Sequence, residues 1–220
     1  MEQTFLTNGS YIQISISENQ RIFARQLVEH SLSHHQVANI WDKHHDKLSQ
    51  TRMMRFTGSL GEIIFADCYH LPRPSKSFGA TDGQDLGQDF LIQSEEHSFS
   101  VDIKSMKRKS GTLGLDYVLN IPASQLHKAN SKTSHYFCIS FHQCPTEGSI
   151  ASLLGFIDKA ALEKGEIGIL YKSGTKRIRS DGTSFTFYEN TYEVLVQDFD
   201  PPVVTNYIKK LPGFRVCALK

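Results

Sequence analysis

Apolar and polar residues alternate along residues 99–104, and this period of two predicts a half-buried β-strand. The apolar positions are Phe99, Val101 and Ile103. Side chains two positions apart on a strand point to the same face, so Asp102 and Lys104 are expected to share the face opposite the apolar residues. A second apolar run at 90–92 precedes this strand across a polar segment at 93–98. We therefore expect two short antiparallel strands joined by a tight turn.

The N-terminal quarter has the pattern of one strand followed by helices. Residues 11–16 alternate as a short strand, and Ser17 with Gln20 forms a capping box that opens a helix. A second helix is expected from a cap at Ser33 to about Lys47, on the helical spacing of its apolar residues.

A third helix is predicted over 51–70, and it carries one acid on a face of small residues. Its apolar stripe is Phe56, Leu60, Ile63 and Ile64, and the neighbouring stripe is Gly58, Ser59, Glu62 and Ala66. Small residues allow a helix to lie close to a sheet, so Glu62 is expected to reach the end of the sheet. The alternative is a solvent-exposed glutamate at the rim.

The remainder of the chain alternates between predicted loops, strands and short helices. Residues 71–83 are rich in proline and glycine and predict a loop, and Asp158 to Lys164 predicts a short helix ended by Gly165. The other expected elements are a helix beginning at 121–126, a central strand at 136–141, a strand at 152–157, and strands at 184–188 and 192–196 around a turn at Asn190. The tail to Lys220 is expected to pack back on the fold.

Composition places the chain among ordinary globular proteins. It has 220 residues, 39% hydrophobic and 21% charged, which suit one domain with a full core. The net charge of +1 means that any nucleic-acid surface must be local. The four cysteines form no CxxC pair and fit reduced thiols. No apolar run approaches a membrane span and the N-terminus is polar, so we expect a cytoplasmic protein with no membrane partner.

The predicted hairpin concentrates groups suited to phosphate chemistry. Asp89 precedes its first strand, while Asp102 and Lys104 lie on its second. Two carboxylates and a lysine at one end of a sheet suit a hard divalent cation and a scissile phosphate. Asp82 and Asp85 lie nearby but are expected to serve turns.

Two basic segments and a histidine-rich region are further candidates. Lys107, Arg108 and Lys109 follow the second hairpin strand, and a predicted hairpin carries a second basic set. That set is Lys172, Lys176, Arg177 and Arg179. Both suit a phosphate backbone, and a solvated loop is the alternative for the first. The predicted N-terminal helices carry His30, His34, His35, His44 and His45, without the carboxylate or cysteine spacing of a zinc signature. They favour a polar helix face over a histidine metal site.

The order of these predicted elements resembles the PD-(D/E)XK nuclease superfamily, the restriction-endonuclease-like fold. The order is a helix with Glu62, a strand preceded by Asp89, a strand with Asp102-Ile-Lys104, and then a helix and a strand. The resemblance covers about residues 52–142. Gln88 stands where the motif has proline, and Asp85 is the alternative to Asp89.

The resemblance implies an α/β (α+β) fold with a mixed central sheet flanked by helices. It would form one domain with three parts: a helical extension at 1–50, a catalytic core at 52–142 and a β-rich part with a hairpin at 150–220.

The resemblance also implies a metal site. Asp89, Asp102 and the backbone carbonyl of Ile103 would coordinate Mg²⁺, with Mn²⁺ as a substitute, and Glu62 would bind the metal directly or through water. Lys104 would orient or help to deprotonate the attacking water and stabilise charge on the phosphate.

The expected function is a Mg²⁺-dependent endonuclease that cleaves double-stranded DNA, with a type II restriction enzyme as the first hypothesis. Double-strand cleavage by a protein with one site usually needs two copies, so a homodimer is expected. The alternatives are a phage or mobile-element nuclease of repair or transposition, a catalytically silent nucleic-acid-binding member of the same fold, and a histidine-site metalloenzyme.

Overall fold

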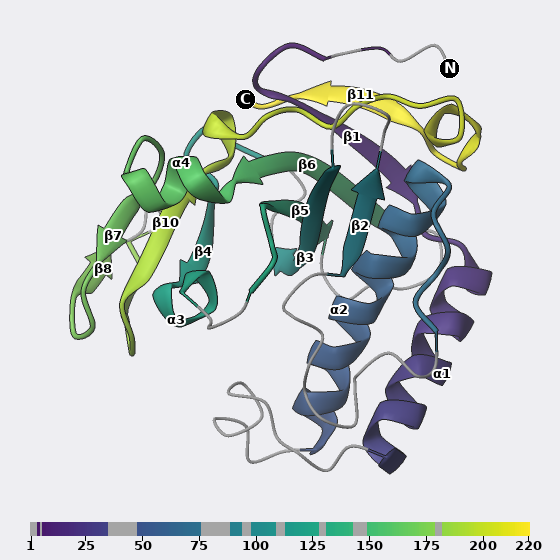
Figure 1. Ribbon diagram of the computed structural model, residues 1–220, viewed down its shortest axis with the longest axis horizontal. Helices are drawn as coiled ribbons and strands as arrows, with labels where there is room; N and C mark the ends of the chain where they lie inside the picture. Colours follow the sequence, from purple (N-terminus) through teal and green to yellow (C-terminus); the bar gives the residue numbers. More distant parts are fainter. Residues whose placement is uncertain are drawn as a thin grey trace.

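A mixed six-stranded sheet runs through the middle of the molecule, in the order β11-β1-β6-β5-β3-β2 (Figure 1). Strands β3 and β5 are parallel, and the other neighbours are antiparallel. The computed structural model describes residues 4, 6–34, 48–75, 89–93, 98–108, 113–127, 131–142, 149–178 and 182–220. The strands of this sheet are β1 (Ser10–Ser15), β2 (Phe90–Gln93), β3 (Ser98–Arg108), β5 (His135–His142), β6 (Ile150–Asp158) and β11 (Arg215–Ala218).

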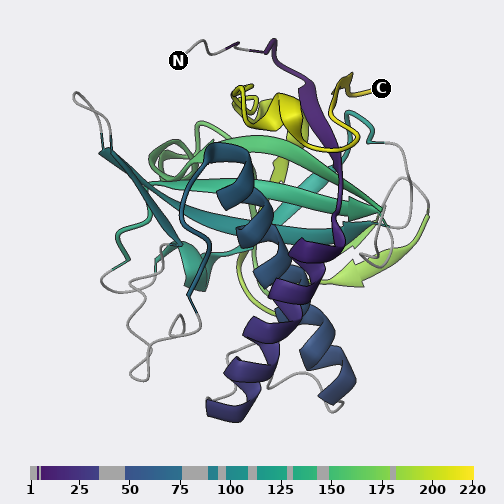
Figure 2. The same ribbon diagram turned by 90° about the vertical axis from the view of Figure 1, so that its right-hand side faces the viewer.

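Two long helices, α1 (Glu18–His34) and α2 (Leu48–Tyr69), cover one face of this sheet, and their lower ends extend beyond it (Figures 1 and 2). Ile63 and Ile64 of α2 pack in one buried cluster with Val101 and Ile103 of β3. Burial of these branched side chains, each worth about 1.5–3 kcal/mol, fixes the helix on the sheet.

The opposite face is covered mainly by a second, smaller sheet in the order β4-β10-β7. Its strands are β4 (Val118–Pro122), β7 (Ile169–Tyr171) and β10 (Thr191–Leu195), and the short helices α3 (Ala123–Leu126) and α4 (Lys159–Lys164) lie in the same region. A second buried cluster joins Tyr136 and Cys138 of β5 to Leu119 of β4, Val194 of β10 and Leu162 of α4. A separate hairpin pairs β8 (Lys176–Ile178) with β9 (Ser184–Thr186).

The 3-10 helices η2 (Val196–Asp198) and η3 (Ile208–Lys210) lie between β10 and β11. No described helix is long and apolar enough to cross a membrane.

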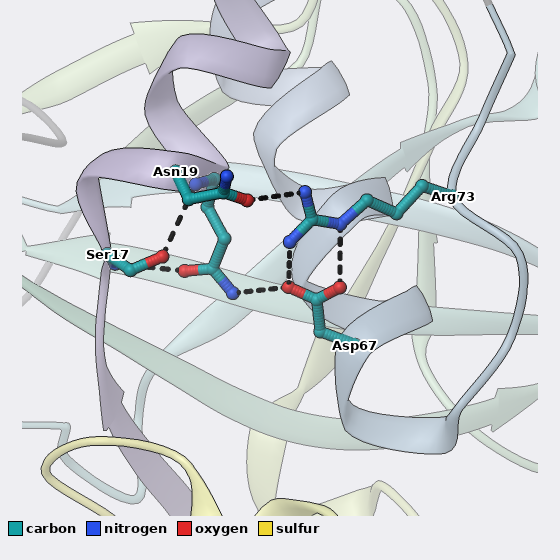
Figure 3. Close-up of polar contacts among 5 residues, drawn as sticks. Ser17, Asn19, Asp67 and Arg73 are labelled. Carbon is teal, nitrogen blue, oxygen red and sulfur yellow. Dashed lines mark hydrogen bonds and ion pairs between the residues drawn. The ribbon is translucent and has the colours of Figure 1, made fainter.

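A polar network fastens the start of α1 to the end of α2 (Figure 3). The capping box is present, since the Ser17 amide donates to Gln20 Oε1 at 3.0 Å and the Gln20 amide to Ser17 Oγ at 3.3 Å. Gln20 Nε2 also donates to Asp67 of α2, which accepts two hydrogen bonds from the Arg73 guanidinium. Arg73 in turn donates to Asn19, so the segment leaving α2 is held against α1.

The mixed α+β class predicted from the sequence is confirmed, with differences in the details. Both long helices lie on one face, and β1 from the N-terminal part is an inner strand of the central sheet. The strands expected at 184–188 and 192–196 are present as β9 and β10 but do not pair with each other, because β9 pairs with β8 while β10 pairs with β4 and β7. The hairpin expected around the second basic set is wrong for the same reason, since β7 and β8 pair with other strands. Most of the helix expected at 33–47 lies outside the described residues.

Candidate active site

Asp102 and Lys104 lie on the same face of β3, as the alternating pattern predicted. Their flanking residues Val101 and Ile103 are buried under α2. The Lys104 ammonium lies 2.8 Å from Asp102 Oδ1 and 2.9 Å from Oδ2, and each side chain is 20% exposed. The acid and the lysine therefore form a tight, partly shielded ion pair on the face opposite α2.

Asp89 reaches this pair through the backbone of β3. Its amide donates to the Val101 carbonyl at 2.9 Å, and its Oδ2 accepts from the Ile103 amide at 2.6 Å. The carboxylate thus binds one residue beyond Asp102, at the point where β2 begins to pair with β3. This bond also stabilises the end of the strand pairing, so Asp89 has a structural role beside any catalytic one.

Glu62 lies on α2 above the junction of β2 and β3. Two nearby residues of α2 lie against these strands. Gly61 is so close to β3 that a Cβ there would meet the side chains of Ser105 and Ile103. The Phe65 ring packs against Phe90 of β2, with the ring centroids 5.1 Å apart. Of the predicted small-residue stripe, Ala66 is fully buried in the core, whereas a Cβ at Gly58 would meet nothing within 4 Å; the glycine in close contact with β3 is Gly61. Glu62 is half-buried on the α2 side, whereas Asp102 and Lys104 lie on the other face.

The described residues contain no group of three or more His, Cys, Asp or Glu that could hold a metal ion. Glu62, Asp89 and Asp102 therefore do not form a three-ligand set. The oxygen donors at this point of β3 are the Asp102 carboxylate, the Ile103 carbonyl and the Asp89 carboxylate, which accepts from the Ile103 amide. These hard oxygens fit Mg²⁺, which keeps several of its waters and needs only one or two carboxylates.

The surroundings of the Asp102–Lys104 pair are apolar enough to perturb its titratable neighbours. Burial raises the pKa of Tyr136 well above its ordinary value, and the Asp102 and Glu163 carboxylates raise it further. Burial also raises the pKa of the Cys138 thiol, with Lys104 lowering it and Asp102 raising it. Both side chains come from β5, so this part of the sheet disfavours new negative charge.

The first basic segment is divided between the surface and the core. Strand β3 continues to Arg108, so these residues lie within the strand instead of in a loop after it. Lys107 is exposed, but Arg108 is only 5% exposed and donates to the Ser140 carbonyl at 2.7 Å and to Ser152 Oγ at 2.9 Å. The expectation that Arg108 contacts DNA is therefore corrected, because its guanidinium is bonded inside the fold.

The second basic segment lies on β7, β8 and the turn between them. Lys172 and Lys176 are exposed, whereas Arg177 is bound to the Glu193 carboxylate at 3.0 Å and lies over the Tyr171 ring. Hydrogen bonding to Glu193 and its charge raise the pKa of Arg177. Among the described cations of this segment, the exposed ones are Lys172 and Lys176.

Several candidate residues lie outside the described residues: Lys109, Arg179, Asp82, Asp85, His35, His44 and His45. Their assignments stay predictions.

The sequence did not single out two residues that contact Lys104. Gln125 Oε1 accepts from the Lys104 ammonium at 2.9 Å, and that ammonium lies 5.2 Å from the centroid of the Tyr136 ring. Gln125 is in a one-turn helix and Tyr136 in an apolar run, so neither belongs to a recognisable motif.

Comparison with protein-family models, with curated proteins and with solved structures finds no match.

Proposed function

We propose that this protein is a Mg²⁺-dependent DNA endonuclease of the PD-(D/E)XK type. One observation carries the proposal: the Asp89 carboxylate is bound to β3 at Ile103, between Asp102 and Lys104, which are paired on one face. This places two acids and a lysine at the junction where β2 meets β3. The helix with Glu62 before the hairpin, and β5 parallel to β3 after it, support the same assignment.

Each residue of the site would have a different role in phosphodiester hydrolysis. Bound Mg²⁺ would lower the pKa of a water ligand and polarise the phosphoryl oxygen. Asp89 and Asp102, with the Ile103 carbonyl, would hold the ion, and Glu62 would act from the α2 side through water. Lys104 would keep a positive charge beside the attacked phosphate and orient the water, because its ammonium is already fixed at this point of the strand.

Exposed basic residues offer a surface for the DNA backbone. Lys107 lies three residues beyond Lys104 on β3, Lys172 follows β7, and Lys176 is the first residue of β8. Tyr188, which is 94% exposed, stands on the loop after β9, and its carbonyl accepts a hydrogen bond from Ser173. Lysines would bind phosphates, and an exposed aromatic ring offers stacking or sugar contacts.

The preferred form of this function is cleavage of double-stranded DNA by a homodimer, as in a type II restriction enzyme. The second candidate is a silent DNA-binding protein of the same fold. It is favoured by one observation: among the described residues, the three acids do not gather into a three-ligand group.

Cleavage of supercoiled plasmid separates the two candidates. The wild-type protein is expected to nick or linearise the plasmid with Mg²⁺ and not with EDTA. Asp102→Asn should reduce the rate by at least about 100-fold, because it removes a charged metal ligand. Asp198→Asn, at an exposed acid of η2, is the matched control and should cleave at the wild-type rate. DNA binding without Mg²⁺-dependent cleavage would instead support the silent protein.

A further inference from the structure

The Lys104 ammonium has a third polar contact, outside the set of acids. Two of its contacts are with the two oxygens of Asp102, and the other is with Gln125 Oε1 at 2.9 Å. An ammonium has three N–H donors, so these acceptors can use all of its hydrogen-bonding capacity. The Tyr136 ring lies beneath it, at 5.2 Å from centroid to nitrogen.

Gln125 is held in place from the other side of its helix. The Ala123 amide donates to the Asn190 carbonyl at 2.8 Å, and Ser124 Oγ donates to Glu189 Oε2 at 2.6 Å. Leu126 is fully buried in the second core cluster. The one-turn helix α3 is therefore hydrogen-bonded to the loop between β9 and β10. These bonds fix the backbone from which the Gln125 side chain contacts Lys104.

We infer that Gln125 is a positioning residue for Lys104. A cation bound to Asp102 competes with Lys104 for the same carboxylate oxygens, whereas the neutral amide oxygen of Gln125 remains available to the ammonium. Gln125 then keeps the ammonium at the β3 face while Asp102 serves the metal. This role in cleavage rests on the proposed nuclease function, but the contact itself does not.

The first test measures the lysine without any cleavage. Lysines of the full-length protein are acylated with acetic anhydride, and the rate at each lysine is followed by peptide mass spectrometry. In the wild type, Lys104 should react more slowly than exposed Lys172. Gln125→Leu removes the acceptor while keeping the size, and it should speed the reaction of Lys104 by at least about threefold, because a charge-assisted hydrogen bond is lost.

Two further variants separate positioning from general damage to the fold. Gln125→Glu keeps an oxygen acceptor and should restore the slow reaction. Ser124→Ala, on the same helix, removes the bond to Glu189 and leaves the 125 side chain in place, so it should leave Lys104 protected. If Gln125→Leu does not fold, Gln125→Met supplies the same comparison.

The second test measures the rate of cleavage separately from the affinity for DNA. Single-turnover cleavage at saturating DNA should be about 10-fold slower in Gln125→Leu, while DNA affinity in Ca²⁺ stays within about twofold of wild type. Gln125→Glu should recover most of the rate. A purely structural role for Gln125 would instead lower the thermal midpoint and the DNA affinity together.

The failures are distinguishable. An active wild type whose Gln125→Leu variant shows unchanged Lys104 reactivity or an unchanged cleavage rate overturns the role of Gln125 alone. A wild type that binds DNA and does not cleave it with Mg²⁺ overturns the proposed function, and the positioning role in cleavage with it, even where the lysine reactivity changes as expected.

Discussion

At the scale of single residues, two neighbouring cations on β3 differ in their exposure to solvent. Lys107 is exposed, whereas Arg108 is buried beside Ser140 and Ser152. Burial lowers the pKa of Arg108, and its partners Ser140 and Ser152 are uncharged, so it depends on these oxygen acceptors. The difference follows from the pleat: Arg108 shares the face opposite α2 with Lys104, two steps of two residues away, and with Asp102, three steps away.

Alanine substitutions should therefore separate stability from DNA binding. Arg108→Ala should lower the free energy of unfolding by about 2–4 kcal/mol, because it leaves buried acceptors unpaired and removes the packed side-chain stem. Lys107→Ala should change it by less than about 0.5 kcal/mol and reduce the salt slope of DNA binding by about one. Urea unfolding and binding titrations at several salt concentrations measure both. A neutral effect of Arg108→Ala on stability would contradict its assignment to the core.

Sequence reasoning found the residues whose chemistry is visible locally. The alternation around Asp102 and Lys104 predicted their shared face, and the Ser17–Gln20 capping box predicted the start of α1. It did not find Gln125, because its contact with Lys104 depends on where β4 and α3 lie. These elements are separated from β3 in sequence and brought to it by burial of Leu119 and Leu126, which a single sequence does not reveal.

At the scale of elements, the approach of α2 to β3 depends on one glycine. A Cβ at Gly61 would overlap the Ser105 side chain, while one at Gly58 would meet nothing within 4 Å. The sequence drew attention to Gly58 on helical spacing alone. Which glycine meets the sheet depends on the rotation of the helix about its axis, which Ile63, Ile64 and Phe65 set by their burial.

The two glycines should respond oppositely to alanine. Gly61→Ala should destabilise the protein by about 1–3 kcal/mol, because the extra methyl group forces β3 and α2 apart. Gly58→Ala should be neutral or stabilise by up to about 1 kcal/mol, since alanine has the higher helix propensity. Chemical unfolding of both variants gives the comparison. Equal effects at the two positions would mean that α2 is rotated relative to the arrangement described.

At the scale of the whole molecule, many weakly acidic side chains are buried on both faces of the central sheet. Burial is the largest cause of the raised pKa of each of them: Tyr11, Cys68, Tyr69, Tyr117, Tyr136 and Cys138. Each holds its proton more tightly in the folded state than in the unfolded chain. The folded state is therefore penalised once the pH rises above the ordinary thiol value of 9.0.

Stability should consequently be flat near neutral pH and fall above about pH 9. The cysteines of the unfolded chain ionise first, and the tyrosines follow from about pH 10. Each proton released only on unfolding lowers the free energy of unfolding by about 1.4 kcal/mol per pH unit. Urea titrations from pH 7 to 10.5 measure this, and Cys68→Ala should lessen the slope between pH 9 and 10. Stability that rises with pH across this range would contradict the protonated, buried state of these groups.

The central claim is that the β2–β3 junction hydrolyses DNA, and one comparison tests it most directly: the rate of Mg²⁺-dependent plasmid cleavage by wild type and by Lys104→Met. Methionine keeps an unbranched apolar side chain beside Tyr136 and removes the charge together with the hydrogen bonds to Asp102 and Gln125. We predict cleavage by the wild type and a loss of at least about 100-fold in the variant, with Lys209→Met, at an exposed lysine of η3, unchanged. Cleavage by Lys104→Met at the wild-type rate would contradict the claim.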